Sequence, residues 1–497
     1  MLQTTYPELN QTLFNIQTLA QSIIEIESIS NYNQQEGLAL NEEEIAYLEN
    51  LAKKLHRKLT DSEVFGFSQI NSEHCRHKIF NGTFIIDGEE KTDSLFKMIR
   101  KTSQINPNSI ISAYKDNVAF IDGPSIQNFA PKSPEKPDFY ALNELNTVIS
   151  LKAETHNFPT TVEPFNGAAT GSGGEIRDRM AGGKGSIPLA GTAVYMTPYA
   201  RLEPNRPWEK LAERPWLYQT PLEILIKASN GASDFGNKFG QPLIAGSVVT
   251  FEHQEKNQIY GFDKVIMLAG GIGFGKKEEC LKDKPKEGDQ IVLLGGDNYR
   301  IGMGGAAVSS TDTGAMSNQI ELNAVQRSNP EMQKRVNNVI RALVESGVNP
   351  IVSIHDHGAG GHLNCFSELV EETGGKINID KLPIGDPTLS YKEILGNESQ
   401  ERMGLIVPKE SIEFVQKIAA RERAPMYIVG EVTNDHIFQF YSEKTGEKPL
   451  NLSLFDMFGS APKTVLDDQT ISTQFEEITY DQSSIYEYIN QVLQLES

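Results

Sequence analysis

The sequence predicts a mixed α/β fold with more than one domain. Short runs rich in β-branched residues alternate with longer stretches of helical periodicity. Several strand-like runs end in a glycine-rich turn followed by a helix start, the order of elements found in α/β proteins. A chain of 497 residues can bury more than one core, and the charged stretch 276–288 is suited to separate two of them.

The first 80 residues are predicted to be mainly helical. Apolar residues recur at helical spacing within residues 13–26, which indicates a docking helix, and the polar stretch 28–35 follows as a linker. Helices are expected to begin at Asn41 and near Thr60, because each is followed three residues later by a glutamate in an N-capping pattern. The second of these helices leads into Q-I-N-S-E-H-C-R-H-K, residues 69–78.

The rest of the chain alternates between predicted strands and helices. The predicted strands are 83–86, 118–121, 147–151, 191–196, 242–250, 264–269, 291–294, 350–354 and 404–407, of which 242–250 and 264–269 are expected to be buried. The predicted helices are 221–237, one beginning at Asn329-Pro330, 362–372 and 484–495. Loops are expected at 131–137 and, as a proline-rich surface excursion, at 204–215.

The stretch 151–185 concentrates the residues most suited to chemistry. A strand-like run leads to an acid, an imidazole and an amide, and a glycine-rich segment follows. We interpret that segment as a loop whose backbone N–H groups bind a phosphate, because glycines let successive N–H groups converge on an anion. Arg177 suits a phosphate and Glu154 and Asp178 suit magnesium. The glycines alone would also fit a flexible hairpin.

The decapeptide 69–78 forms a second cluster. If the helix persists, His74 and His77 share one face of it, and two histidines beside an acid suggest zinc, although no third ligand has a recognisable spacing. Cys75 suggests a thiol nucleophile or a packed side chain. The favoured interpretation places a histidine and basic groups over a phosphorylated substrate, and the alternative is a solvated polar helix end.

A third cluster is H-D-H-G-A-G-G, residues 355–361, at the junction of a predicted strand and helix. Anions and metals collect at such junctions in α/β proteins, so Asp356 is a further metal-ligand candidate. His355, His357 and His362 could be ligands, but histidines at such turns more often bind backbone groups or a phosphate. The polar sequence N-E-S-Q-E-R-M follows at 397–403.

Composition narrows the classes of partner and compartment. The formal net charge of −20 argues against nucleic acid and anionic membranes as partners, and solubility is its simplest explanation. No signal-peptide pattern is present and no apolar run approaches membrane-spanning length. Cys75, Cys280 and Cys365 are too few and too dispersed for a disulfide framework. The chain is therefore expected to be cytoplasmic.

Six segments together resemble a known family. They are N-S-E-H-C-R-H-K, K-A-E-T-H-N-F-P-T, G-A-A-T-G-S-G-G-E-I-R-D, N-A-V-Q-R-S-N-P-E-M, H-D-H-G-A-G-G and N-E-S-Q-E-R-M, in the family's order within residues 28–460. The chain resembles the large formylglycinamide ribonucleotide amidotransferases (phosphoribosylformylglycinamidine synthases) of purine biosynthesis. The resemblance implies the fold of aminoimidazole ribonucleotide synthetase and selenophosphate synthetase.

The resemblance also implies a domain order. Residues 1–27 would be the remnant of an amino-terminal domain, 28–77 a helical linker domain, 90–275 a ferredoxin-like ATP-binding domain, 288–443 a second α/β domain and 444–497 a tail. No second G-A-A-T-G segment occurs in the sequence. The chain is therefore expected to be the first half of a synthetase, without the second half and without the glutaminase.

The family reaction is that of an ATP-dependent carbon–nitrogen ligase. ATP and Mg²⁺ serve to phosphorylate the amide oxygen of formylglycinamide ribonucleotide, and ammonia from a glutaminase domain or subunit then displaces phosphate. The resemblance implies that the catalytic residues are His74 and His156, with His156 as proton acceptor, and that the metal ligands are Glu154, Asp178 and Asp356.

Nucleotide and substrate contacts follow from the same motifs. The ATP-binding residues would be His77, Lys152, Gly167, Ala168, Ala169, Thr170, Gly171, Ser172, Gly173, Gly174, Glu175, Ile176, Arg177, Asp178 and, as a weaker inference from a glycine break, Ala245, Gly246 and Ser247. The substrate-binding residues would be Thr155, Asn157, Phe158, Arg177, Gln326, Glu398, Ser399 and Gln400. Some relatives carry histidine where Phe158 stands, so no role carries over to that side chain.

Two other functions remain open. The chain could be another enzyme of the same fold, such as aminoimidazole ribonucleotide synthetase, although the smaller enzymes lack the N-S-E-H-C-R-H-K segment. It could also be a non-catalytic nucleotide-binding half that serves assembly. In the synthetases of this fold the active sites lie between two halves, so a second half or a second copy of the chain is the expected protein partner.

Overall fold

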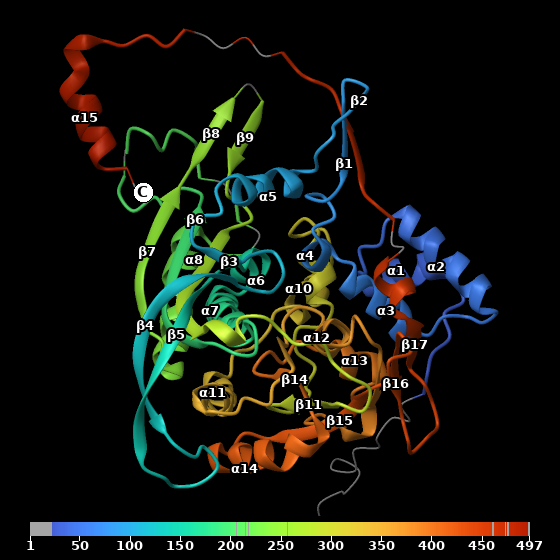
Figure 1. Cartoon of the computed structure of the whole chain (residues 1–497). Helices are drawn as coiled ribbons and strands as arrows, with labels where there is room; N and C mark the ends of the chain where they lie inside the picture. Colours follow the sequence, from blue (N-terminus) through green and yellow to red (C-terminus); the bar gives the residue numbers. More distant parts are fainter. Residues whose placement is uncertain are drawn as a thin grey trace, which may run out of the picture.

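Two β-sheets with helices between and around them form the body of the protein (Figure 1). The computed structural model describes residues 22–495 apart from 205, 214, 217, 256, 460–461, 473 and 475–476. Within that part of the chain no helix is long and apolar enough to cross a membrane. The mixed α/β class predicted from the sequence is confirmed.

Helices at the amino-terminal end pack on the second sheet. They are α1 (Ile29–Glu36), α2 (Glu42–Leu55), α3 (Asp61–Ile70) and the one-turn α4 (Glu73–Arg76). Asn41 with Glu44 and Thr60 with Glu63 form reciprocal capping boxes, as predicted, because in each pair the side chains satisfy one another's exposed backbone N–H groups. Every residue of α3 is buried, which makes it the central helix of this group.

One expectation for this region was wrong, and a second is corrected only at its end. The polar stretch 28–35 is not a linker, because Ser28 caps α1 and Gly37, at φ 64°, ends it in the left-handed conformation. Most of the docking helix predicted at 13–26 lies outside the described residues. Its described end, residues 22–26, is not helical, and Glu25 makes an isolated antiparallel bridge with Thr60. Backbone pairing with the segment around Thr60 outweighs the local helical periodicity there.

The first sheet has six strands in the order β3-β4-β5-β10-β6-β7. The strands are β3 (Ile110–Ser112), β4 (Ala119–Pro131), β5 (Tyr140–Thr155), β6 (Ile187–Thr197), β7 (Leu243–Thr250) and β10 (Ile266–Lys276). Only the β6–β7 pairing is parallel. The run 242–250 was expected to be buried, but β7 is the edge strand and residues 244–247 are exposed.

Helices α6 (Asn157–Val162), α7 (Pro164–Met180) and α8 (Pro221–Phe239) lie against one face of this sheet. The predicted phosphate loop at 167–178 is therefore wrong, because those residues form the body of α7. Within a helix, N–H groups bond to carbonyls one turn earlier and cannot converge on an anion. The glycines of this segment are required for close packing of α7, as the contacts below show.

Contacts around α7 explain its glycines. A Cβ at Gly167 would stand 2.4 Å from the backbone of Pro159 and Thr160, and one at Gly173 would stand 2.8 Å from the Phe235 ring. A Cβ at Gly171 would meet the side chains of His156 and Met267 at 2.9 Å. Because these glycines lack side chains, α7 approaches α6 closely at Gly167, the sheet at Gly171 and α8 at Gly173.

The second sheet has seven strands in the order β12-β14-β11-β15-β13-β16-β17. They are β11 (Gln290–Leu294), β12 (Ser353–Asp356), β13 (Gly375–Asn378), β14 (Met403–Val407), β15 (Met426–Val432), β16 (Ile437–Tyr441) and β17 (Leu450–Ser453). Along β11 the side chains alternate between two cores: Ile291 and Leu293 face the core of the amino-terminal helices, whereas Val292 and Leu294 face α7 and α8.

Helices cover both faces of this second sheet. On the face toward the first sheet lie α11 (Pro330–Glu345) and α14 (Ile412–Glu422), and on the other lie α3, α12 (Gly361–Leu369) and α13 (Tyr391–Gly396). Shorter helices and helical turns are α9 (Gly305–Val308), α10 (Asn318–Asn323), η2 (Lys277–Glu279), η3 (Ile379–Lys381), η4 (Lys409–Ser411), η5 (Phe455–Gly459) and η6 (Gln482–Ser484).

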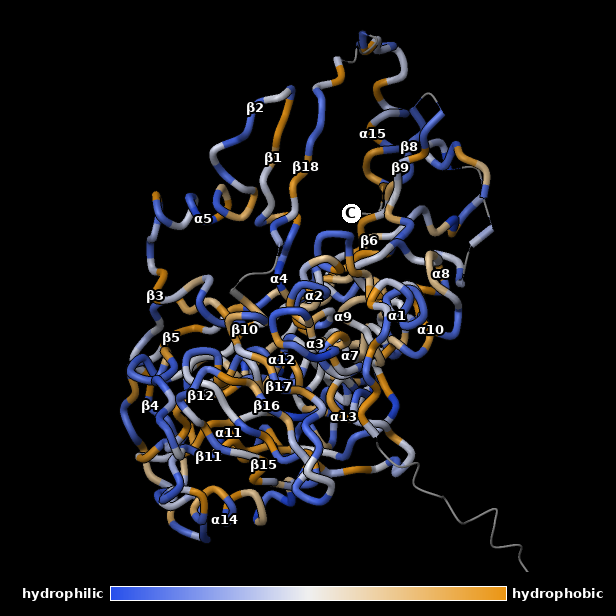
Figure 2. The backbone as a smooth tube through the Cα atoms, turned by 90° about the vertical axis from the view of Figure 1, so that its right-hand side faces the viewer, coloured by the Kyte–Doolittle hydropathy of each residue, from blue (hydrophilic) through white to orange (hydrophobic). Residues whose placement is uncertain are grey.

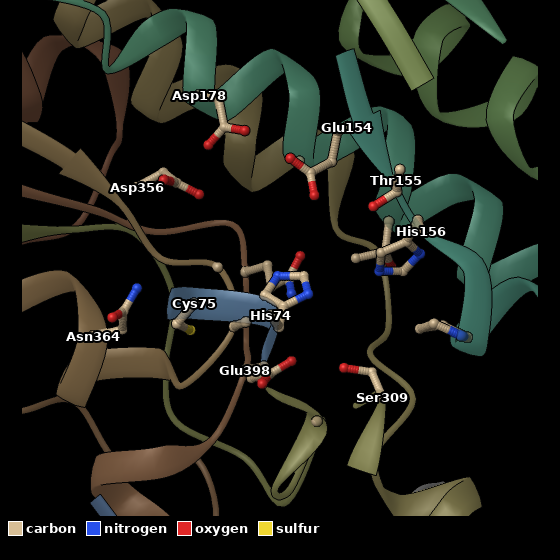
Figure 3. A pocket seen from close by; sticks show the side chains of 18 of the residues that line it. His74, Cys75, Glu154, Thr155, His156, Asp178, Ser309, Asp356, Asn364 and Glu398 are labelled. Carbon is tan, nitrogen blue, oxygen red and sulfur yellow. The ribbon is translucent and has the colours of Figure 1, made fainter. Parts of the chain in front are cut away.

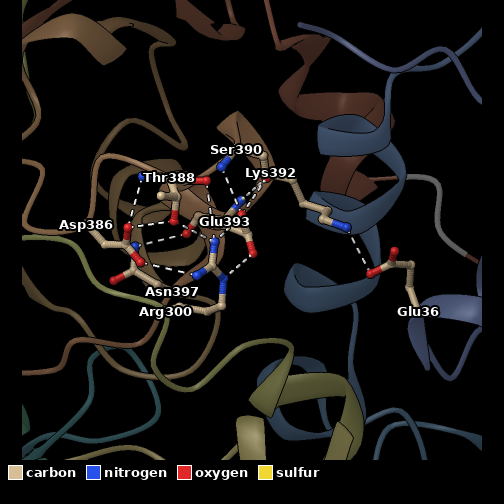
Figure 4. Close-up of polar contacts among 8 residues, drawn as sticks. All are labelled: Glu36, Arg300, Asp386, Thr388, Ser390, Lys392, Glu393 and Asn397. Atoms are coloured by element: carbon tan, nitrogen blue, oxygen red, sulfur yellow. Dashed lines mark hydrogen bonds and ion pairs between the residues drawn. The ribbon is translucent and has the colours of Figure 1, made fainter. Parts of the chain in front are cut away.

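A polar cluster joins the amino-terminal helices to α13 and fixes the chain entering the N-E-S-Q segment (Figure 4). Lys392 on α13 pairs with Glu36 on α1 at 2.9 Å. Arg300 binds Glu393 at 2.7 Å and Asp386 at 3.2 Å. Asn397, which directly follows α13, bonds back to the carbonyl of Glu393. These contacts attach α13 at several points and hold the start of the loop that follows it.

The remaining elements extend from the body. Strand β1 (Thr83–Ile86) pairs with β2 (Glu89–Glu90) and, in parallel, with β18 (Val465–Asp468) near the carboxyl end (Figure 2). Helix α5 (Leu95–Ile105) and the ribbon of β8 (Glu252–Glu255) and β9 (Gln258–Gly261) are peripheral. The predicted terminal helix is α15 (Ile485–Leu493), which has no buried residue.

The packing of α7 predicts opposite outcomes for two glycine-to-alanine changes. Gly167→Ala should destabilise the protein by roughly 1–3 kcal/mol, because the new methyl group would overlap backbone atoms that cannot rotate away. Gly174→Ala should stabilise it by up to about 1 kcal/mol, since the nearest atom to its Cβ is 3.6 Å away and alanine favours helix. Urea unfolding measures both. Equal, small effects would contradict the close packing described here.

Candidate active site

A cavity of about 730 Å³ lies where the two sheets and the amino-terminal helices meet. Its wall is formed by the end of β5, the start of α6, one side of α7, the short helix α4, the chain around α9, and the turns that follow β12 and α13. Figure 3 shows side chains from all these regions pointing into it. Segments widely separated in sequence thus share one enclosed site.

Three carboxylates from both sheets face one end of the cavity. Glu154 lies on β5, Asp178 on α7 and Asp356 at the end of β12 (Figure 3). The Lys152 ammonium lies 2.9 Å from Glu154 and 2.8 Å from Asp178. The Asn117 side-chain amide donates to Asp178 at 3.2 Å and to Asp356 at 2.9 Å. Lys152 thus joins Glu154 to Asp178, and Asn117 joins Asp178 to Asp356 of the second sheet.

The electrostatics of this end reflect crowding of like charge. Burial, together with the nearby charge of Asp178, raises the pKa of Asp356 to about 7. Burial opposes ionisation of Asp178 as well, but the Lys152 ammonium outweighs it and lowers the pKa of that carboxyl. Burial works against the charge of Lys152 too, and Asp178 and Glu154 together raise its pKa. A further cation would relieve the repulsion that remains.

The residues at this end fit a magnesium ion by chemistry. Carboxylate oxygens are ligands that Mg²⁺ prefers, and Asp178 and Asp356 are buried with their charges close together. In the described part of the chain, however, no three acidic, histidine or cysteine side chains are already arranged around a metal position. Lys152 lies between two of the carboxylates instead, so metal binding requires its ammonium to move.

Two histidines line the cavity near these acids. His74 is on α4, and His156 follows directly after β5, in the turn that starts α6 (Figure 3). Burial lowers the pKa of His156 to about 3, so its ring is neutral at pH 7. Its Nδ1 atom is buried and has no hydrogen-bond partner within the described structure. A neutral imidazole keeps one ring nitrogen unprotonated, which is what a proton acceptor requires.

The arrangement of α4 weakens both the zinc-site and the thiol-nucleophile interpretations of residues 69–78. The helix breaks at Asn71, restarts at Glu73 and ends at His77, whose φ is 50°, so His74 and His77 do not share a continuous helix face. The His77 ring instead stacks on Phe96, although it also lines the cavity. Burial raises the pKa of Cys75 to about 12, which keeps the thiol protonated and unsuited to nucleophilic attack at neutral pH.

The N-E-S-Q segment supplies a buried carboxylate and an amide to another wall. Glu398 accepts from the Gly360 N–H at 2.9 Å and from Gln326, and burial raises its pKa to about 7. Arg177 donates to Gln400 and, at 2.8 Å, to Gln333. Its guanidinium is buried and directed between the sheets. Arg177 therefore links α7 to α11 and to the loop that precedes β14.

The other residues singled out from the sequence divide into two groups. Those lining the cavity are Thr155, Asn157, Phe158, Thr170, Gly171, Gly174 and Gln326. Those outside its lining are Gly167, Ala168, Ala169, Ser172, Gly173, Glu175 and Ile176, which pack within or around α7, Ser399, and Ala245, Gly246 and Ser247, which are exposed on β7. Only one side of α7 therefore contributes to the wall of the cavity.

The histidines of the third cluster have structural partners. The His357 ring bonds to His362 at 2.8 Å, and His362 bonds to Asn298 at 2.9 Å. Burial lowers the pKa of both rings well below its usual value. His355 pairs with Glu368, and both line the cavity. Arg402 joins the same buried network and also donates to the Asn397 carbonyl, which anchors the N-E-S-Q turn.

Sequence reasoning missed several cavity residues. Asn117 lies in a short turn before β4, and Lys264 lies two residues before β10. Neither residue belongs to a recognisable motif. Ser309, Ser310 and Asn364 also line the cavity. The sequence signal available was a polar side chain next to a predicted strand end, which is too common to identify a site.

Comparison with known families assigns two regions. Residues 29–78 match the formylglycinamide ribonucleotide amidotransferase linker domain. Residues 286–442 match the AIR synthase related protein, C-terminal domain. The first region contains α1 to α4, including His74, and the second contains the whole of the second sheet except β17.

Solved structures with the same fold include two of PurL from Thermotoga maritima. PurL complexed with FGAR superposes with a TM-score of 0.60 and 22% identity, covering 88% of this chain and 59% of that one. PurL complexed with ATP gives a TM-score of 0.58 and 21% identity, covering 90% and 61%. At these identities the likeness establishes the shared fold.

A sequence relative is closer. The phosphoribosylformylglycinamidine synthase of Dictyostelium discoideum is 39% identical over 484 aligned positions, in an alignment that covers 94% of this chain and 36% of that protein. The chain thus spans about a third of the length of this curated relative. Over most of its length the chain is therefore similar to one part of a phosphoribosylformylglycinamidine synthase, and residues 29–78 match the linker domain of the same enzyme.

Proposed function

We propose that this chain forms an ATP-dependent synthetase site that converts formylglycinamide ribonucleotide to formylglycinamidine ribonucleotide in de novo purine biosynthesis. The observation that carries the proposal is the single cavity in which acids from both sheets face His74 and His156. The names of its relatives support it, since one is a phosphoribosylformylglycinamidine synthase and PurL structures hold FGAR or ATP. The chain spans about a third of that relative, and we infer that the synthetase activity resides at least partly in this region.

The reaction requires a poor electrophile to be activated. The amide oxygen of the substrate forms a bond to the γ-phosphorus of ATP, and the bond from that phosphorus to ADP breaks. The ammonia nitrogen then bonds to the activated carbon and loses a proton, and phosphate leaves with the electron pair of the C–O bond. Little covalent chemistry falls to the protein, whose task is to orient the reactants and stabilise charge.

The cavity offers residues for each of these tasks. Lys152, which lies beside Glu154 and Asp178, would bind nucleotide phosphates, and Glu154, Asp178 and Asp356 would hold Mg²⁺. When bound, Mg²⁺ would neutralise phosphate charge. His74 would stabilise charge on the reacting groups from α4. His156 is neutral at pH 7 and would accept the proton from the attacking ammonia.

The remaining polar residues would bind the substrate. Gln326, Glu398 and Gln400 lie on one wall, and Thr155 and Asn157 lie on another. The match of residues 29–78 to the linker domain favours this function over aminoimidazole ribonucleotide synthetase, because that domain carries the N-S-E-H-C-R-H-K segment. The cavity, which is lined by acids, amides and histidines, favours it over a purely structural half.

Nucleotide affinity should depend on magnesium through Asp178. Isothermal titration with a non-hydrolysable ATP analogue should show tighter binding with Mg²⁺ than without it. Asp178→Asn should remove at least about tenfold of that gain, since it withdraws one ligand charge from the acidic end. Asp234→Asn, on the exposed side of α8, is the matched control. Equal affinity with and without Mg²⁺ in the unaltered chain would refute the metal site.

His74 should act in turnover and contribute little to stability. With the second synthetase half supplied, His74→Ala should lower phosphate release at saturating ammonium by about 10²-fold, the usual scale for a positioned acid or base. The melting temperature should stay within a few degrees of the parent. His253→Ala, on the exposed strand β8, controls for loss of an imidazole. A collapse in melting temperature would show that His74 is structural.

A protein partner is expected to cover the outer face of the first sheet. Helices α7 and α8 cover only one face. On the other, Leu151 lies opposite Ile272 in the β5–β10 ladder, and Val194 lies opposite Leu268 in the β6–β10 ladder. Cross-strand neighbours share a face, so these residues form an apolar, partly exposed surface. A second synthetase half or a second copy of the chain would bury it.

The chain alone should therefore self-associate. Sedimentation at about 10 μM should show dimers or larger species, and Ile272→Lys should shift them toward monomer, because it places a charge in the apolar surface. Ile226→Lys, at an exposed position on α8, should not. Glutamine should support no turnover, and ammonia should do so only in an assembled state. A stable monomer that consumes formylglycinamide ribonucleotide unaided would contradict the interface argument.

A further inference from the structure

Lys264 places a positive charge on the cavity wall away from the acidic end. It precedes β10, and its ammonium donates to the carbonyls of Ser309 at 2.9 Å and Thr311 at 3.0 Å. It also lies 5.9 Å from the centre of the Phe158 ring. The ammonium is thus fixed by neutral groups from the chain after α9 and beside the first turn of α6.

Charge pairing distinguishes Lys264 from the other cations of the cavity. The Lys and Arg side chains lining it are Lys152, Arg177 and Lys264. Lys152 pairs with Glu154 and Asp178, and Arg177 lies 3.7 Å from Asp356. Among the described residues, no carboxylate lies within ion-pair distance of Lys264, although Asp312 and Glu321 act on it from farther away. Burial lowers its pKa, as expected for a cation short of compensating charge.

The groups around Lys264 suit a polar, anionic ligand. An ammonium has three N–H donors, and two of those on Lys264 are bonded to carbonyls, which leaves one for a ligand. The hydroxyls of Ser309 and Ser310 line the same part of the cavity and bond to the Ala306 carbonyl. Gln326 is 5% exposed and its Oε1 atom has no partner, so it can accept from a sugar hydroxyl.

The two regions of the cavity lie apart. In Figure 3, Ser309 lies across the cavity from Asp178 and Asp356, with His74 between them in that view. A phosphate monoester would be repelled by the acids unless a metal intervened, whereas it would be attracted at Lys264. The reacting amide would then be located near the histidines. This separation allows a nucleotide and a phosphorylated substrate to occupy the cavity together.

We propose that Lys264 binds the phosphate monoester of the substrate, and so makes the site selective for the ribonucleotide over the corresponding ribonucleoside. This inference rests on the proposed function and adds a binding residue to it. The Lys264 ammonium would form a charge-assisted hydrogen bond to a phosphate oxygen, and the serine hydroxyls would rotate toward the remaining oxygens. No bond is made or broken at this position, so Lys264 is a binding residue only.

Isothermal titration with two ligands tests the inference. Formylglycinamide ribonucleotide and its dephosphorylated nucleoside are each titrated into the full chain, in the presence of Mg²⁺ and a non-hydrolysable ATP analogue. Lys264→Met removes the charge and keeps the length of the side chain, and Lys264→Arg keeps the charge. Lys227→Met, at an exposed lysine on α8, is the control for loss of a surface charge.

We expect Lys264→Met to weaken ribonucleotide binding by at least about tenfold and to change nucleoside binding by less than about twofold. Lys264→Arg should retain most of the ribonucleotide affinity, and Lys227→Met all of it. An equal loss for both ligands would overturn the inference, because it would show that Lys264 only supports the loop at 309–311. If the unaltered chain binds neither ligand, the proposed function itself fails, and this inference fails with it.

Discussion

The close approach of α7 to its neighbours is the constraint on which the site depends. Glycines at 167, 171 and 173 leave no room for side chains between this helix and α6, β10 and α8. The polar residues of its second half, Arg177 and Asp178, are therefore held between the two sheets rather than at a surface. A bulkier helix would separate the sheets and with them the carboxylates that face the cavity.

Electrostatics at the acidic end follow from that geometry. Asp178 from the first sheet's helix layer and Asp356 from the second sheet are brought together through Asn117, and Lys152 offsets only part of their charge. Such a cluster is unfavourable by itself and becomes favourable when a cation and phosphates complete it. The stability of the packing between the two sheets and the affinity for a charged ligand are thus coupled, because the same side chains join the sheets and line the site.

Local sequence patterns predicted the local structure well. The capping boxes at Asn41 and Thr60 and the helix starts at Pro221 and Pro330 depend on neighbouring residues only, and the structure has them where expected. The glycine segment 167–178 was misinterpreted because its composition fits a phosphate loop and a closely packed helix equally well, and only tertiary contacts distinguish the two. The run 242–250 looks like a buried strand but lies at an edge, since strand order is not encoded locally.

The candidate site shows the same division. Motif resemblance identified the acids and histidines that converge on the cavity, whereas Asn117 and Lys264 carry no motif and became visible only through their contacts. The sequence predicted which kinds of side chain line the cavity. It could not predict how their charges are paired, because pairing depends on which side chains meet across the sheets. That balance divides the cavity into an acidic end and a region of uncompensated positive charge.

A crystal structure of the chain with Mg²⁺ and a non-hydrolysable ATP analogue tests the account most directly. We predict that the triphosphate occupies the acidic end of the cavity, with Mg²⁺ on oxygens of Glu154, Asp178 and Asp356 and with the Lys152 ammonium moved from between the carboxylates onto a phosphate. A nucleotide bound on the exposed strand β7 around Ala245–Ser247, with Lys152 still paired to Glu154 and Asp178, would contradict it.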